Sequence, residues 1–537
     1  SGPDLAWWML EYGLGTRPSA WQPIQPPTTE PVVSGRLARW AVGTLEQGAY
    51  VLRLTGRALD GATFEEFTQI SLEWIRPAAI SPLGDGAERP DVSRHRVVWQ
   101  APRREAGVSR GEWERDVFLT DLRTGRTYAV ADASGDQVQP RIDGRTVAWR
   151  DEQGDLERID VHACHLAGRS PRCDETVVVE GAGAPDFAVA GRRVYWIESR
   201  AASLPDIHGC VFDRSGIHCT EQPVGLPPRR RTGVASDGLG LAWIEPEGGF
   251  RIGACRLDGR TGECRGEPVV FSALPISRPA VSADLVAWVD LVRFGLPPEL
   301  RICRVDPQSG DCPIVVVEKG VADASPRLSG DRLVWDAHVG DQDADVFFCE
   351  YDRLRARCPV QRLTAEMSEQ RHAAIDGDRV VWQDAREGET RIYGTRLPSL
   401  HGPTSRRART GRLLRIPVYA HDPEGGPLVI AVEAVGVGST EALGARLIAH
   451  GDRRATLLWR PAPDQAGEYV LTFSATAENG LVARRSVRIE VEPGSAVKER
   501  SRAPSGAGSP PARARSRDPR PTSFRDHDAT APRSGAP

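Results

Sequence analysis

The stretch GDRLVW at residues 330–335 recurs with small changes along the middle of the chain. In each copy an aliphatic residue stands two positions before a tryptophan, as Leu333 stands before Trp335, and the residue between them is apolar. Positions i and i+2 of a strand share one face, so such a strand is apolar on both faces and must be covered on both. The copies lie 45 to 50 residues apart and end on Trp99, Trp149, Trp196, Trp243, Trp288, Trp335 and Trp382.

Each repeat is long enough for four short strands. A proline stands nine residues before the tryptophan in four repeats. A variable loop follows the tryptophan, and glycine-containing turns lead to further apolar segments such as 345–348 and 314–317. Glycine supplies the positive φ that such turns need. Four strands in about 47 residues match one β-propeller blade. The sequence therefore predicts an all-β chain with a seven-bladed β-propeller over residues 76–398, with six blades as the alternative.

The seventh repeat has no apolar segment for a fourth strand before residue 398. Residues 78–81, which precede the first repeat, could provide that strand. A ring closed by both ends of the repeat region leaves no exposed sheet edge, and exposed edges invite aggregation. We therefore expect residues 78–81 to complete the last blade.

Two stretches of the repeats, GDRLVW at 330–335 with the later DVF at 345–347, and DGDRVVWQD at 376–384, resemble the TolB-like propeller repeats of bacterial periplasmic and cell-surface proteins. The resemblance covers roughly residues 77–398. It implies a rigid all-β ring, and such repeats specify a fold much better than a ligand.

The propeller region is flanked on both sides by segments with the pattern of short strands. Residues 1–75 are similar to accessory immunoglobulin-like or fibronectin-like modules of secreted bacterial proteins. Residues 411–493 resemble the immunoglobulin-like, cadherin-related modules of bacterial surface proteins, with Tyr469 expected to tie a loop to the backbone. We predict β-sandwiches over 1–75, with a truncated sandwich as the alternative, and over 411–493, a linker at 399–410, and a disordered tail at 494–537, which is rich in Pro, Ser, Ala and Arg.

The cysteines predict disulfides within the repeats. Eight residues separate the partners of every pair, and one pair falls in each of repeats two to six, which suits two positions facing each other across a hairpin. Thr120 and Thr127 occupy the corresponding positions in repeat one. Disulfides persist in oxidising compartments, so we predict an extracytoplasmic protein that is secreted, at the cell surface or in the periplasm. The predicted pairs are Cys164/Cys173, Cys210/Cys219, Cys255/Cys264, Cys303/Cys312 and Cys349/Cys358.

Residues that could carry chemistry are sparse. The sequence contains no nucleophile elbow, paired-histidine zinc motif, P-loop or dinucleotide fingerprint, so we expect no enzyme activity, no catalytic residues, no metal ligands and no cofactor. The pair His162/His165 hints at a metal, and Asp422 with Glu424 could bind Ca²⁺, but a solvated turn is the preferred interpretation of the latter. The candidate ligand-binding residues are Arg103, Arg104 and Trp113, which lie in or beside a long loop of repeat one.

The bulk properties narrow the function. A formal net charge of -4 argues against nucleic-acid binding, and no apolar run is long enough for a transmembrane helix. The chain opens at Ser1 in strand-like sequence, so we expect a processed product or fragment. We predict a monomeric binding or scaffolding protein that presents propeller loops to a protein, peptide or glycan. The alternatives are the non-catalytic accessory region of a secreted hydrolase, for example a subtilisin-like protease, and a propeller-based lyase or glycosidase.

Overall fold

The computed structural model describes the chain between residues 5 and 494, and every described element is a β-strand. The residues within this range that are not described are 33–34, 41, 43–44, 46–47, 73–76, 83–85, 104–113, 153–158, 167–174, 182–185, 199–203, 217, 247–249, 276, 292–294, 307, 322–323, 339–342, 435–439 and 441. Among the described residues, no helix could cross a membrane. The tail predicted at 494–537 lies, apart from Gly494, outside the described residues.

Seven four-stranded antiparallel sheets each contain one of the repeat tryptophans. Six of them are built from consecutive strands, as in the sheet of β26 (Arg327–Ser329), β27 (Arg332–His338), β28 (Ala344–Glu350) and β29 (Gln361–Arg362). The other five are β6 to β9 (ending with β9, Arg126–Ala131), β10 to β13 (ending with β13, Thr176–Val179), β14 to β17 (ending with β17, Cys219–Gln222), β18 to β21 (ending with β21, Cys264–Ser272) and β22 to β25 (ending with β25, Ile314–Lys319). They begin with β6 (Glu88–Ser93), β10 (Asp136–Asp143), β14 (Phe187–Ala190), β18 (Thr232–Ser236) and β22 (Ala280–Ser282).

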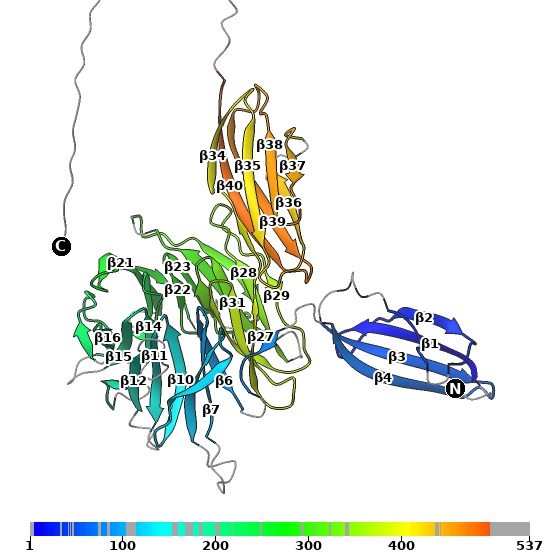
Figure 1. Ribbon diagram of the computed structural model, residues 1–537, viewed down its shortest axis with the longest axis horizontal. Coiled ribbons are helices and arrows are strands. Elements are labelled where there is room, and N and C mark those ends of the chain that lie inside the picture. Colours follow the sequence, from blue (N-terminus) through cyan, green and yellow to red (C-terminus); the bar gives the residue numbers. More distant parts are fainter. Residues whose placement is uncertain are drawn as a thin grey trace, which may run out of the picture. The chain divides into compact units, whose positions relative to one another are not determined.

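The seventh sheet joins both ends of the repeat region. It consists of β30 (Gln370–Asp376), β31 (Arg379–Asp384), β32 (Arg391–Arg396) and β5 (Ala78–Ala79), with Ala79 opposite Tyr393. The prediction that residues 78–81 supply the missing strand is therefore confirmed. The first strand of each sheet also contacts the first strand of the next, and β30 contacts β6, so the series returns to its start (Figure 1). This is a propeller-like, all-β arrangement.

The repeat tryptophans lie in the cores between neighbouring sheets. All seven have relative exposures of 2% or less. Trp335, for example, shares a cluster with Leu333 of its own sheet and with Ala287 and Leu300 of the preceding one. The strands that carry the tryptophans can be apolar on both faces because a neighbouring sheet covers each face.

The paired cysteines form the predicted disulfides wherever both partners are described. Cys210–Cys219, Cys255–Cys264, Cys303–Cys312 and Cys349–Cys358 are bonded, with Cα–Cα separations between 5.3 and 5.6 Å. Cys164 is also disulfide-bonded, and Cys173 lies outside the described residues. In the first sheet the Thr120 and Thr127 hydroxyls form a hydrogen bond of 3.0 Å at the positions that cysteines occupy in repeats two to six. These four disulfides indicate an oxidising compartment.

Removing one of these disulfides should cost a moderate amount of stability. We expect Cys303→Ser with Cys312→Ser to lower the free energy of unfolding by about 2–3 kcal/mol, because the bridge closes a short loop in the unfolded chain. Denaturant unfolding of the oxidised parent and variant measures this difference. Under reducing conditions the two proteins should unfold at closer midpoints, and an undiminished gap there would contradict the explanation.

The C-terminal module consists of two stacked sheets. One has the order β33, β35, β38, β37, and the other β34, β40, β39, β36, with Trp459 and Phe473 fully buried between them. As expected, the Tyr469 hydroxyl donates a hydrogen bond to a backbone carbonyl, that of Gln465, at 3.2 Å. The strand bounds are β33 (Ser399–His401), β34 (Ser405–Arg409), β35 (Leu414–His421), β36 (Leu428–Ala434), β37 (Arg446–Ala449), β38 (Arg454–Trp459), β39 (Gly467–Ala477) and β40 (Val482–Glu492).

One predicted boundary and one predicted architecture need correction. The stretch 399–410, expected to be a linker, forms β33 and β34 of this module. The strand β34 pairs in parallel with β40 at a sheet edge, and only Ala408 of its five residues is buried, so the sequence lacks the alternation that marks a strand. At the N-terminus, the described residues form one four-stranded sheet where a two-layered sandwich was expected. Its order is β2 (Gln22–Thr28), β1 (Leu5–Leu14), β3 (Gly48–Ala58) and β4 (Thr63–Leu72).

Candidate functional site

The three predicted ligand-binding residues do not form a described site. Arg103 donates hydrogen bonds to both carboxylate oxygens of Asp116, at 3.0 and 2.6 Å, and a further one to the carbonyl of Ala133. These bonds tie the guanidinium group to Asp116 at the start of the neighbouring strand and to the segment around Ala133. Arg104 and Trp113 lie outside the described residues.

The predicted pair His162/His165 does not form one site, and neither do Asp422 and Glu424. His165 shares a hydrogen bond with the Thr146 hydroxyl at 3.0 Å, while His162 bonds to Glu175, so the two rings are used separately. Asp422 accepts hydrogen bonds from the backbone N–H groups of Glu424 and Gly426, and Glu424 accepts one from Thr395. The Asp422 carboxylate therefore closes a turn.

A different group of residues converges at the centre of the seven sheets. A cavity of about 550 Å³ is lined by residues from the first strands of all seven. The four arginines that line it stand ten or eight positions before a repeat tryptophan, on either side of the position occupied by proline in four repeats. The lining residues at these two positions include Arg89, Asp91, Gln139, Arg141, Arg278 and Arg327.

Three of the residues at the tenth position have strained backbones. Arg89, Gln139 and His372 have φ values of 49°, 54° and 55°, in the left-handed region that non-glycine residues rarely adopt. Each sits at an irregularity in strand pairing, and such bulges often re-aim a side chain beside a functional site.

Side chains from the preceding sheet hold these bulges. Gln383 accepts a hydrogen bond from the N–H of Arg89 at 3.1 Å, and Gln100 accepts one from the N–H of Gln139 at 2.8 Å. Asp336 accepts one from the N–H of Ala373, which follows His372, at 3.4 Å. All three acceptors stand one residue after a repeat tryptophan, so neighbouring sheets fix the lining of the cavity.

The arginines of the cavity are incompletely neutralised. Within the described part of the chain, Arg89, Arg141 and Arg327 have no carboxylate within 4 Å, whereas Arg278 pairs with Asp186. Burial and the charge of Arg327 lower the pKa of Arg141 well below its usual value and that of Arg278 to about 10. An anion placed among these arginines would offset both the burial of their charges and their mutual repulsion.

The positive charges of the cavity arginines also act on His372. Burial, together with the charges of Arg89, Arg141 and Arg327, lowers the pKa of its imidazole to about 4. The ring is therefore neutral at physiological pH, and it can accept a proton as well as a hydrogen bond.

Farther along the same strands, six residues before the tryptophan, a layer of serine and aspartate side chains borders the cavity. Asp143 accepts a hydrogen bond from the N–H of Gly191 in the next sheet at 2.6 Å, and Asp376 accepts one from the N–H of Arg94 in the first sheet at 2.6 Å. The cavity thus has an arginine level and a level of oxygen acceptors. The residues of the second level are Ser93, Asp143, Asp237, Ser282, Ser329 and Asp376.

The carboxyl group of Asp336 makes the stability of the folded protein depend on pH. Burial raises its pKa to about 6, against the opposing effect of its backbone hydrogen bond. Between about pH 4 and pH 6 the folded state then keeps a proton that the unfolded state loses, so stability should fall as pH rises through this window. We expect Asp336 to contribute a fall of about 2–3 kcal/mol to the parent's stability, and therefore a shallower slope for Asp336→Asn. Denaturant unfolding at several pH values tests this, and parallel slopes would contradict it.

Sequence reasoning missed the cavity although a signal was present. The prolines at position nine were visible as a repeated feature, and arginine stands next to each of Pro90, Pro140, Pro279 and Pro326. Their convergence depends on how the sheets are arranged around a common centre.

Comparisons with known proteins give low similarities. No protein-family model and no curated protein sequence matches this chain. A prolyl endopeptidase structure aligns with 76% of this chain at 12% identity and a TM-score of 0.37, and the chain spans only 56% of that protein. Two 6-phosphogluconolactonase-like structures also align. The structure from Bacteroides uniformis has 13% identity and a TM-score of 0.34, and the alignment covers 68% of this chain and 98% of that chain. The structure from Bacteroides fragilis has 12% identity and a TM-score of 0.32, and the alignment covers 67% of this chain and 96% of that chain.

Proposed function

We propose that the seven tryptophan-bearing sheets are the blades of a closed, seven-bladed β-propeller of the TolB-like type. The successive contacts of the first strands, and the return from β30 to β6, support seven blades over six. We further propose that the C-terminal sandwich is immunoglobulin-like, that the N-terminal sheet belongs to a related module, and that the protein is secreted, periplasmic or displayed at the cell surface.

The function that we propose is the binding of an acidic glycan in the central cavity. The observation that carries it is the group of three arginines, Arg89, Arg141 and Arg327, without carboxylate partners. A guanidinium group binds a carboxylate through two parallel hydrogen bonds, and each such charged contact contributes roughly 1.5–3 kcal/mol.

The two levels of the cavity favour a sugar acid over a simple anion. The carboxylate of a uronic acid would lie at the arginine level, and its hydroxyl groups would reach the serines and aspartates at the other level. Strands rise about 3.3 Å per residue, so position six lies about 7 Å from position eight, which one sugar ring spans, and about 13 Å from position ten, which about two or three rings span.

Calorimetric titration with oligogalacturonate tests this proposal. We expect binding that weakens with salt, no binding of a neutral oligosaccharide of equal length, and losses of about 10-fold or more for Arg141→Gln and Arg327→Gln. Arg256→Gln, on the exposed surface, is the matched control and should bind like the parent. Binding of an oligoglutamate peptide in preference to the glycan would replace the glycan by an acidic peptide. Equal behaviour of all three variants would refute the site.

His372 lies on β30, the strand whose Ile375 and Asp376 line the cavity, and a neutral imidazole there is the base that a second candidate function, an acidic-glycan lyase, would need. In such a reaction an arginine pair stabilises the carboxylate while a base removes the proton from the adjacent carbon. The bond between the next carbon and the glycosidic oxygen breaks, the released electron pair forms a carbon–carbon double bond, and the departing oxygen takes a proton from water. The test is the ultraviolet absorbance of the unsaturated product. If it appears with the parent protein and not with His372→Ala, the protein is an enzyme, and if it never appears, the cavity only binds.

A further inference from the structure

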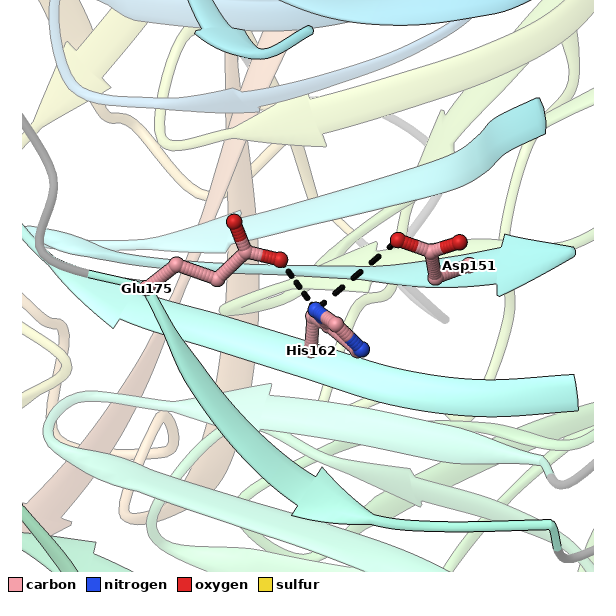
Figure 2. Close-up of side chains that lie close together, drawn as sticks. All are labelled: Asp151, His162 and Glu175. Carbon is pink, nitrogen blue, oxygen red and sulfur yellow. Dashed lines mark hydrogen bonds and ion pairs between the residues drawn. The ribbon is translucent and has the colours of Figure 1, made fainter. Parts of the chain in front are cut away.

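A second cluster of polar residues lies within one sheet, away from the central cavity. Asp151 on β11 (Thr146–Glu152), His162 on β12 (Ile159–His165) and Glu175, just before β13 (Thr176–Val179), each direct one ligand-type atom to a common point, with all three atoms within 4.8 Å of one another. Figure 2 shows both carboxylates facing the Nδ1 atom of His162. Asp151 lies 3.9 Å from this atom, and Glu175 is hydrogen-bonded to it.

The cluster is buried at its base and open at its rim. The side-chain exposures are 1% for Asp151, 10% for His162 and 37% for Glu175. An ion could therefore enter past Glu175 and reach the two inner ligands without any change in the strands.

Asp151 differs from the residues at the same position in other sheets. The acid two residues after the tryptophan is Glu245 in the fourth sheet and Asp384 in the seventh, and each accepts the tryptophan N–H and pairs with an arginine. Asp290, at this position in the fifth sheet, pairs with Arg301 at 2.6 Å. Asp151 makes neither kind of contact with any described residue.

The unused atoms around Asp151 show that its buried carboxylate is only partly compensated, by His162 and by Gln137. Its Oδ1 atom, the Nε1 atom of Trp149 and the Nε2 atom of His162 are all buried without a hydrogen-bond partner among the described residues. An uncompensated buried carboxylate is costly, and here two carboxylates share one imidazole. A cation at the point that they face would remove this cost.

We propose that Asp151, His162 and Glu175 bind a divalent transition-metal ion, with Zn²⁺ as the best fit. One imidazole nitrogen and two carboxylate oxygens suit Zn²⁺, whereas Ca²⁺ requires six to eight oxygens. Three protein ligands leave a coordination position for water or for a group of a bound partner. None of these residues lines the central cavity, so this site is independent of glycan binding.

The next sheet provides a matched control. His208 is hydrogen-bonded to Glu221 at 3.2 Å, with the same sequence separation as His162 and Glu175. Glu198 stands at the position that corresponds to Asp151, and it accepts a hydrogen bond from the Trp196 N–H at 3.0 Å. His208 therefore has the same local surroundings without a free buried carboxylate.

The experiment is a titration of the full chain, freed of metal with a chelator, with Zn²⁺ alone, followed by calorimetry and thermal unfolding. We expect one Zn²⁺ per chain, a higher unfolding temperature, and a loss of affinity of at least about 10- to 100-fold for His162→Ala and for Glu175→Gln. His208→Ala should keep the affinity of the parent.

Glu175→Gln guards against a folding artefact, because Glu175 lies at the rim and its replacement leaves the buried residues in place. Unchanged Zn²⁺ affinity in both His162→Ala and Glu175→Gln would overturn the proposal, as would equal losses in His162→Ala and His208→Ala. Absence of Zn²⁺ binding to the metal-free parent would also overturn it and would leave the three residues as an ion-pair cluster.

Discussion

Replacing Trp335 by alanine should lower the free energy of unfolding by about 3–5 kcal/mol, the range found when a large aromatic side chain is removed from a packed core. Trp335 is fully buried and lies 5.9 Å from the ring of Phe347, centroid to centroid. Its loss would open a cavity between two sheets that cannot close without moving both. Denaturant unfolding followed by far-ultraviolet circular dichroism measures the effect.

Phe250→Ala is the control for this experiment. Phe250 is 49% exposed, so its removal should change stability by less than about 0.5–1 kcal/mol. If the two substitutions cost the same, the tryptophans do not form the contacts between sheets on which the proposed ring depends.

The second large effect concerns the closure of the ring. Ile80→Pro should destabilise the propeller by about 3 kcal/mol or more, because proline removes an N–H donor and disturbs the strand that carries it. The N–H of Ile80 donates to the carbonyl of Ile392 at 2.7 Å, and Ser81 accepts a hydrogen bond from the N–H of Ile392 at 2.9 Å. Loss of these bonds would expose the edge of β32.

Ile80→Val separates backbone from side-chain effects at the same position. It keeps the N–H and removes one methylene group, so we expect a cost of about 0.5–1.5 kcal/mol. Hydrogen exchange of residues 391–396 should accelerate in Ile80→Pro and not in Ile80→Val. Similar exchange in both variants would show that β5 is not required for closure.

The sequence alone predicted the features that depend on residues close together in the chain. The apolar strands ending at the tryptophans follow from the two-residue period of a strand, and the disulfides follow from two cysteines at matched positions of one hairpin. The strand β5 was predictable because only the seventh repeat lacked a fourth strand. The strand β34 was not, because a parallel edge strand with one buried residue leaves almost no pattern.

Both candidate sites were decided by tertiary structure. Arg89 and Arg327 are more than 200 residues apart in the chain, and they border one cavity only because the first strands of all seven sheets meet at the centre. The left-handed backbones of Arg89 and His372 depend on acceptors in neighbouring sheets, which no local pattern encodes. The ligand cluster at His162 likewise depends on register, since hydrogen bonding between strands, and not sequence spacing, brings Asp151 and Glu175 to the same imidazole.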